Sequence, residues 1–413
     1  MSRVVFISLL AFTSVLTSFA HAAISLKQLA ELTPTDRVNQ DWFGTSIAID
    51  KDTVVVGDFD ANIEQYGGAY VYVKPAGGWE NMTQVAKLTS SDNGVGFGTS
   101  VAISGNVIVV GAANTSNFNG PMATPGAVYV FVKPASGWKD MTETAKLVAS
   151  DGIAGDAFGN SVSISGGTIA VGAFFVNNFS GRAYVFTRTG STWKQAAELT
   201  ASDSSGFLDY LGCSVAISGN TVVAGSFGHN NFAGATYVYV EPGTGWTNMT
   251  ETAELSVANG RGGDNLGFSV GISGTTIVAG APGAANGNGS AYVYVEPANG
   301  WGTTSNFNAQ LAAPDAVQGD SFGQAVGSSS SGGVVVVGAP GQTVGGNVEQ
   351  GAAYVYVRPK TGWVTTRRAS SELTASDGAA FDTMGVSVGV SGSTFVTGAP
   401  KSNTPGEAYV FAP

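Results

Sequence analysis

The sequence has very few of the residues from which cross-links, metal centres and nucleophilic sites are usually built. Among 413 residues there are one cysteine, Cys213, and two histidines, His21 and His229. An intramolecular disulfide is therefore impossible, and sites made of several cysteines or histidines are excluded. Cys213 either packs in the interior or is a reactive thiol. Packing is favoured, because no basic neighbour in the sequence would lower its pKa.

Charge is also scarce. Charged residues make up 11% of the chain, and the formal net charge is −11. Nucleic acids and anionic membranes attract clustered Lys and Arg, so we expect neither as a partner.

Long apolar runs are absent except near the start of the chain. Arg3 is followed by an apolar run from Val4 to Leu16 and by Ala20-His21-Ala22, a small-x-small cleavage pattern. This order predicts a signal peptide over residues 1–23. The run is too short to span a bilayer. We therefore expect a secreted or cell-surface protein with no integral membrane contact.

Glycine, in contrast, is abundant, with 59 residues, and it recurs at regular intervals. The chain contains seven copies of a unit that opens with Phe-Gly or a similar pair. The glycines of these pairs are Gly44, Gly98, Gly159, Gly212, Gly267, Gly323 and Gly385. Each unit has up to four strand signals, of which the third carries a Tyr-Val-aromatic pattern. The repeats predict an all-β, seven-bladed β-propeller that occupies residues 24–413 as a single domain.

The two ends of the chain are offset from the repeat. The last unit stops after its third strand, whereas a spare fourth-strand segment, Leu29-Ala30-Glu31-Leu32-Thr33, precedes the first unit. An open array would expose an unpaired strand edge at each end. We therefore predict that Ser25 to Thr33 pairs with Glu407 to Phe411 and completes the last blade.

The units resemble the FG-GAP repeat, which forms the seven-bladed propeller of integrin α chains and occurs in exported bacterial proteins. The resemblance rests on the opening Phe-Gly pairs and on Gly-Ala-Pro after the second strand, as in Gly280-Ala281-Pro282 and Gly338-Ala339-Pro340. It implies a ligand surface on the loops that join strands two and three and on those that join one unit to the next.

The family's calcium loops do not carry over, because turns such as Ser104-Gly105-Asn106 are short and lack carboxylates. No cofactor is expected. One weak candidate for a cation site has oxygens at alternate positions of the first unit, on Asp58, Asp60, Asn62 and Glu64. Ile63 stands where a calcium loop needs glycine, which counts against this site.

Two patterns that resemble catalytic motifs are better explained by structure. Gly-x-Ser-x-Gly occurs around Ser269 and Ser387, but in strands and not at a strand-to-helix turn. Carboxylates recur before each unit, and paired carboxylates are typical of glycosidases. A residue present in every unit is better explained as a turn former. These carboxylates are Asp41, Asp156, Asp209, Asp264, Asp320 and Asp382, with a second set at Asp36, Asp92, Asp151, Asp203, Asp315 and Asp377.

Aromatic residues in irregular loops are the better candidates for function. Three successive units carry an Asn-Phe pair between strands two and three, and Trp42, Phe207 and Tyr210 lie in loops that join units. The pairs are Asn117-Phe118, Asn178-Phe179 and Asn231-Phe232. Each Phe either projects and contributes to a binding rim or folds back under its own loop.

The sequence therefore predicts an exported, non-enzymatic propeller that binds an extracellular glycan or protein through loops on one face. Two alternatives stay open. One is a structural component of an extracellular layer, and the other is a hydrolase with carboxylates at the axial channel.

Overall fold

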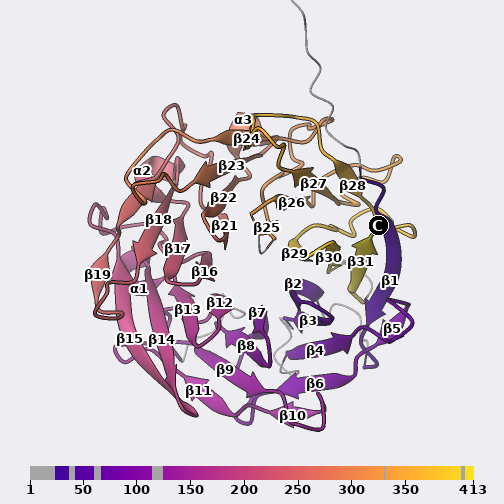
Figure 1. Cartoon of the computed structure of the whole chain (residues 1–413), viewed down its shortest axis with the longest axis horizontal. Helices are drawn as coiled ribbons and strands as arrows, with labels where there is room; N and C mark the ends of the chain where they lie inside the picture. Colours follow the sequence, from indigo (N-terminus) through magenta and orange to yellow (C-terminus); the bar gives the residue numbers. More distant parts are fainter. Residues whose placement is uncertain (1–23, 37–41, 60–66, 114–123, 330–331, 401–404) are drawn as a thin grey trace, which may run out of the picture.

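A computed structural model of the chain describes residues 24–36, 42–59, 67–113, 124–329, 332–400 and 405–413. Within these residues, seven sheets stand as blades around a central axis (Figure 1). The predicted all-β, seven-bladed propeller is confirmed. The predicted signal peptide lies outside the described residues.

Each blade is a sheet whose four main strands lie side by side, with the first strand nearest the axis and the fourth at the rim (Figure 1). Blades 1 and 2 are β2 (Phe43–Asp50), β3 (Thr53–Asp58), β4 (Gly68–Val73) and β6 (Ala86–Thr89), then β7 (Phe97–Ser104), β8 (Val107–Ala112), β9 (Ala127–Val132) and β11 (Ala145–Leu147). Blades 3 and 4 are β12 (Ser161–Ser165), β13 (Thr168–Ala173), β14 (Arg182–Thr189) and β15 (Thr192–Thr200), then β16 (Val215–Ser218), β17 (Thr221–Ser226), β18 (Ala235–Val240) and β20 (Ala253–Leu255). Blades 5 and 6 are β21 (Ser269–Ser273), β22 (Thr276–Ala281), β23 (Ser290–Val295) and β24 (Ala309–Leu311), then β25 (Val326–Ser328), β26 (Val334–Ala339), β27 (Ala352–Val357) and β28 (Ser371–Leu373). Blade 7 is β29 (Ser387–Ser391), β30 (Thr394–Ala399), β31 (Glu407–Ala412) and β1 (Lys27–Thr33).

The first strands crowd around the axis, where small side chains let neighbouring backbones approach. In blade 3 the hydroxyl oxygens of Ser161 and Ser163 accept hydrogen bonds from the backbone N–H groups of Val215 and Ile217 in blade 4. The alternation of serine with apolar residues therefore serves contacts between blades.

The aromatic residues of the third strands form the core between blades. Phe43 packs edge-on against Tyr70 and Tyr72, with ring centroids 5.5 and 6.3 Å apart. The same cluster contains Ala30 of β1 and Val410 of β31, so it lies between the last blade and the first. The interpretation of the paired aromatics as inter-blade core is confirmed.

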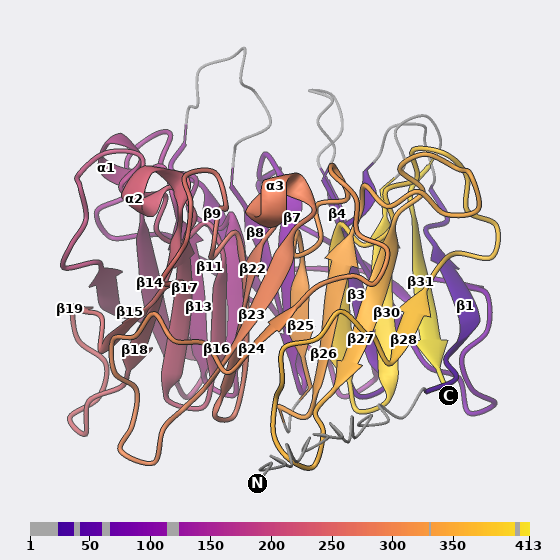
Figure 2. The same cartoon turned by 90° about the horizontal axis from the view of Figure 1, so that it is seen from above.

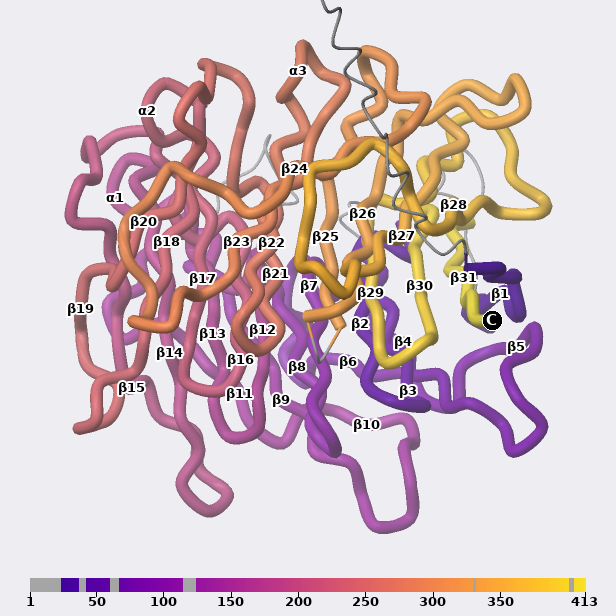
Figure 3. The backbone as a smooth tube through the Cα atoms, turned by 45° about the horizontal axis from the view of Figure 1, so that its top comes forward, coloured from indigo at the N-terminus to yellow at the C-terminus, as the bar shows by residue number. Residues whose placement is uncertain are grey.

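The ring is closed by pairing of the two ends of the chain. Strand β1 runs antiparallel to β31, with Lys27 opposite Ala412 and Leu32 opposite Ala408. Figure 3 shows the indigo β1 beside the yellow β31. The predicted pairing is confirmed.

Some blades are also linked by short strands that the sequence did not predict. β5 (Met82–Thr83), β10 (Met141–Thr142) and β19 (Met249–Thr250) lie in connections between third and fourth strands. Each pairs in parallel with the fourth strand of the preceding blade, as β5 does with β1. These segments add backbone hydrogen bonds at the rim.

In blades 3, 4 and 5 the connections between second and third strands lie together at one end of the ring (Figure 2). They contain the short helical turns α1 (Val176–Phe179), α2 (His229–Phe232) and α3 (Ala284–Gly287). Figure 2 shows all three turns at the same end, which we call the loop face. Among the described residues, no helix is long and apolar enough to cross a membrane.

Candidate functional site

Seven aromatic side chains from blades 3, 4 and 5 touch one another on the loop face. We call this set the aromatic cluster. Its members are Phe174, Phe175, Phe179, Tyr210, Phe227, Phe232 and Phe268. Tyr210 is central, because its ring stacks on Phe227 at 4.6 Å and lies 5.8 Å from Phe179 and 6.3 Å from Phe232. None of the seven is fully buried, so the cluster reaches solvent.

Backbone hydrogen bonds join the loops that carry these rings. The N–H of Tyr210 donates to the carbonyl oxygen of Phe179 over 2.7 Å, and that of Asn265 donates to the carbonyl of Phe232 over 3.0 Å. The connection between second and third strands of one blade is thus tied to the loop that enters the next blade. The expectation that these two loop types share one rim holds here.

The backbone that holds the rings is strained. Phe179, Tyr210 and Phe232 have φ values of 66°, 59° and 64°. Residues with a Cβ rarely adopt this left-handed region, at a cost of about 1–3 kcal/mol each. Blade 5 has Gly287 where blades 3 and 4 have Phe179 and Phe232. The phenylalanines therefore occupy a position for which the backbone favours glycine.

The predicted binding residues are only partly brought together. Phe179, Phe232 and Tyr210 belong to the aromatic cluster, and Asn178 and Asn231 are exposed beside it. Phe179 is 38% exposed and touches Phe175 of its own loop, so it neither projects freely nor folds away.

Two predicted aromatics stand apart from the cluster. Trp42 is 44% exposed on blade 1, and Phe207 is 59% exposed near Tyr210 in sequence; neither has a ring contact within the described part of the chain. Asn117 and Phe118 lie outside the described residues.

Four members of the aromatic cluster are not among the binding residues predicted from the sequence. They are Phe174, Phe175, Phe227 and Phe268. A signal for two of them was present, because Phe174 and Phe227 replace the proline of Gly-Ala-Pro, which other units keep as Pro282 and Pro340. Phe268 follows the glycine of an opening pair, where Gln324 follows in the next unit.

The serines of the Gly-x-Ser-x-Gly motifs link neighbouring blades. The hydroxyl of Ser269 donates to the carbonyl oxygen of Gly323 over 2.8 Å, and that of Ser387 donates to Gly44 over 2.7 Å. The structural explanation of this motif is confirmed.

Most of the recurring carboxylates that are described form or brace loops. Asp320 accepts from the N–H of Val317 at 2.6 Å, and Asp156, Asp264 and Asp382 make the equivalent bond. Burial raises the pKa of Asp320, a tendency that its bond from Val317 opposes. In the second set, Asp92 accepts from the Tyr129 hydroxyl at 2.7 Å. The turn interpretation is confirmed for Asp156, Asp264, Asp320 and Asp382, whereas Asp41 of the same set lies outside the described residues.

Of the weak cation candidate, only Asp58 is described; it is a buried residue at the end of β3. Asp60, Asn62 and Glu64 lie outside the described residues. That hypothesis stays a prediction.

Comparison with protein families matches the FG-GAP repeat seven times, over residues 26–72, 82–131, 141–186, 193–239, 249–294, 306–356 and 368–411. The first match begins at the strand that completes the last blade and ends in the third strand of the first, so the sequence repeat is offset from the blades. A search of curated proteins found no match. Since the seven matches cover most of the chain and the fold agrees with them, the chain belongs to the FG-GAP repeat family.

Proposed function

We propose that this propeller is an exported, non-enzymatic recognition protein that binds an extracellular glycan or protein through the aromatic cluster on its loop face. The observation that carries the proposal is the placement of Phe179 and Phe232 on left-handed backbone, where blade 5 uses Gly287. Strain of this kind persists where the surrounding structure holds it, and it is frequent at ligand-binding sites.

The composition of the surface supports the same proposal. Exposed Asn178 and Asn231 lie next to the rings, and partly exposed rings offer apolar faces beside amide donors and acceptors. A sugar ring can stack its C–H face on an aromatic side chain while its hydroxyl groups bond to amides. A protein partner could use the same combination, because aromatic side chains are enriched in the cores of interfaces. The predicted signal peptide favours export, which would place either ligand outside the cell.

The test is binding of the purified chain to a glycan array, together with affinity capture from the native extracellular material. The informative variant is Phe179→Gly combined with Phe232→Gly, because glycine is the residue that blade 5 already has at this point. We expect the double variant to fold and to lose the interaction.

Phe381→Gly is the matched control. Phe381 is exposed, has φ 68° and makes no ring contact within the described residues. It should leave binding intact. Equal losses in the control and the double variant, or no ligand in either assay, would contradict the proposal. Self-association without a ligand would favour the structural-layer alternative instead.

A further inference from the structure

Blades 3, 4 and 5 place two polar side chains at the same point of the repeat. One residue precedes the blade, and the other lies on the fourth strand opposite a third-strand tyrosine. The pairs are Asp151 with Glu198, Asp203 with Glu254, and Asn259 with Gln310. The three adjacent blades therefore provide an internal comparison.

Blades 3 and 5 both avoid an uncompensated pair of negative charges. In blade 3, Nη1 of Arg182 lies 2.5 Å from Asp151 and 2.8 Å from Glu198. In blade 5 both side chains are neutral amides. Partly buried carboxylates that face each other need a cation or a proton.

Blade 4 keeps both carboxylates but has Ala235 where blade 3 has Arg182. Among the described residues, no lysine or arginine forms an ion pair with Asp203 or Glu254, and the one ion-pair partner of Asp203 is His229.

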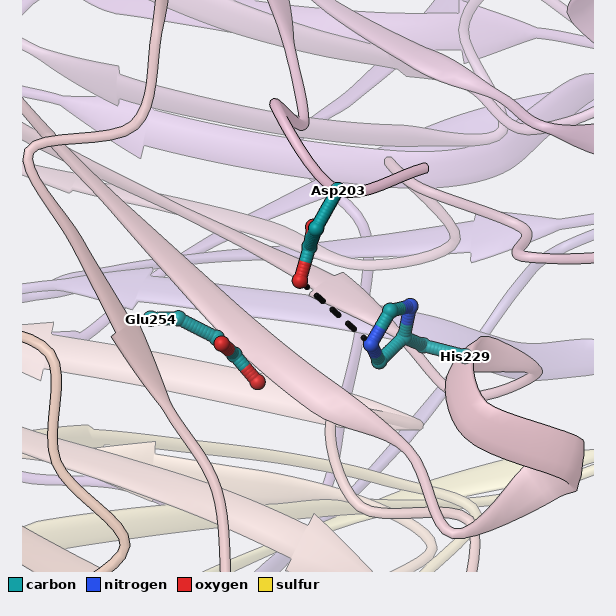
Figure 4. Close-up of side chains that lie close together, drawn as sticks. All are labelled: Asp203, His229 and Glu254. Carbon is teal, nitrogen blue, oxygen red and sulfur yellow. Dashed lines mark ion pairs between the residues drawn. The ribbon is translucent and has the colours of Figure 1, made fainter. Parts of the chain in front are cut away.

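His229 faces this pair from α2. It occupies the position of Val176 in α1 and Ala284 in α3, both buried apolar residues. Its side chain is 16% exposed, and one ligand atom each from Asp203, His229 and Glu254 lies within 4.8 Å of the others. Figure 4 shows the three side chains converging from a loop, a helical turn and a strand.

The spacing suits a shared metal ion better than a direct hydrogen bond. Nε2 of His229 lies 3.5 Å from Oδ2 of Asp203. Ordinary N–H···O hydrogen bonds are shorter, at about 2.7–3.2 Å. Two ligands on one tetrahedral ion with bonds of about 2.1 Å lie about 3.4 Å apart.

Two further groups lie beside these ligands. Nδ1 of His229 is buried, has no hydrogen-bond partner among the described residues, and lies 3.5 Å from Oδ1 of Asp209, whose side chain is only 4% exposed; a small movement would bring the two atoms within hydrogen-bond distance. A proton on Nδ1 would leave the Nε2 lone pair free for a metal. The Tyr237 hydroxyl donates to Oδ1 of Asp203 over 2.8 Å and leaves Oδ2 for the same ion. Metal-bound histidines and carboxylates commonly have such outer partners.

We propose that blade 4 binds one divalent transition-metal ion of the zinc class through Nε2 of His229, Oδ2 of Asp203 and the Glu254 carboxylate. One imidazole and two carboxylates suit Zn²⁺ better than Ca²⁺, which takes six to eight oxygen ligands. The ion neutralises the paired carboxylates of blade 4, as Arg182 neutralises the equivalent pair in blade 3. It also anchors α2, which carries Phe232 of the aromatic cluster.

The experiment is titration of the purified chain, free of any affinity tag, with ZnCl₂ and separately with CaCl₂ in a calorimeter. Co²⁺ is then used as a visible-absorbance probe. We expect one Zn²⁺ per chain, weaker Ca²⁺ binding and an absorption band for bound Co²⁺.

Two of the variants introduce the residue that blade 5 has at the same position, Ala284 or Gln310. We therefore expect them to preserve the local structure. His229→Ala and Glu254→Gln should each weaken Zn²⁺ binding by more than about 100-fold, because losing only an outer partner typically costs about 10–100-fold. Asp209→Asn, which changes only an outer partner, should weaken Zn²⁺ binding by about 10–100-fold. Glu372→Gln is the control: Glu372 faces Asp315 in blade 6, where Gln342 takes the place of histidine. It should leave Zn²⁺ affinity unchanged.

Three results would overturn the proposal. They are the absence of Zn²⁺ binding to the unaltered chain, full stoichiometry after His229→Ala, and equal affinity for Ca²⁺ and Zn²⁺. The first would leave His229 as a neighbour of Asp203 and Asp209 with no metal between them. The second would move the ion to another cluster, such as Glu31, Asp377 and Glu407 in blade 7.

Discussion

Gly398 in the last blade packs directly against the carbonyl oxygen of Gly44 in the first. A Cβ placed on Gly398 would overlap that oxygen, although φ of Gly398 lies outside the left-handed region. Equivalent contacts join other blades, as between Gly57 and the carbonyl of Gly98. The glycine of the opening Phe-Gly pair and the glycine near the end of the second strand thus let adjacent blades approach. The Gly398–Gly44 contact lies where the last blade meets the first.

We expect Gly398→Ala to lower the free energy of unfolding by about 1–3 kcal/mol or more, because the extra methyl group must push two blades apart. Gly77→Ala is the control, since its Cβ would meet no atom within 4 Å. Urea denaturation followed by tryptophan fluorescence measures both. Equal stabilities of the two variants would show that close approach at this joint is not required.

A second prediction concerns strand β1, which closes the ring by completing the last blade. Leu32 is fully buried between the last and first blades, whereas Leu29 of the same strand is exposed at a bulge. Leu32→Ala should cost about 2–5 kcal/mol. Leu29→Ala should change stability by no more than about 0.5 kcal/mol. Thermal unfolding that is insensitive to Leu32→Ala would mean that the ring does not depend on its N-terminal strand.

Cys213 should be unreactive while the chain is folded. The residue is partly exposed, but its thiol donates to the carbonyl oxygen of Gly267 in blade 5 over 3.4 Å, and desolvation by the surrounding protein raises its pKa from 9.0 to about 12. The reactive thiolate is therefore scarce at pH 8. A chromogenic disulfide reagent should label the protein only after denaturation, and rapid labelling of the folded chain would contradict this.

The same pKa shift predicts a loss of stability in alkali. Below pH 9 the thiol is protonated in both the folded and unfolded states, so this contribution to stability is fully present. As pH rises from 9 toward 12, the thiol of the unfolded chain loses its proton while that of the folded chain keeps it. The free energy of unfolding therefore falls by up to about 1.4 kcal/mol per pH unit. Cys213→Thr, the residue that blade 1 has as Thr45, should remove this part of the pH dependence.

The fold was predictable because each unit repeats the same physical requirements. Paired aromatics such as Tyr70 and Tyr72 alternate at the strand period, and the opening glycines mark every unit. The short strands β5, β10 and β19 were not predictable, since two residues carry no periodicity and their partners lie in another blade.

The candidate sites were only partly predictable for a related reason. Whether Phe179 projects or packs depends on the left-handed backbone of its loop and on Tyr210 in the next blade. His229 lies 26 residues after Asp203 and 25 residues before Glu254, so no two of the three are neighbours in the sequence. These three meet because a helical turn, an entry loop and an outer strand of one blade converge, which no local pattern in the sequence reveals.

Backbone strain at Phe232 on the loop face can be measured directly. At Phe232, where φ is 64°, alanine would lose the ring and keep the strained backbone, while glycine would lose the ring and relieve it. Left-handed backbone costs a residue with a Cβ about 1–2 kcal/mol. Phe232→Gly should therefore be more stable than Phe232→Ala by about 1 kcal/mol.

This order is the reverse of that expected at a position with ordinary backbone. Glycine gives the unfolded chain more freedom, and it usually makes a protein about 0.4–1 kcal/mol less stable than alanine does. Val364, an exposed residue whose φ is not positive, provides the comparison, and there alanine should be the more stable variant. If glycine were the less stable residue at both positions, then Phe232 would not be strained. Ligand binding would then no longer be needed to explain why this ring is retained.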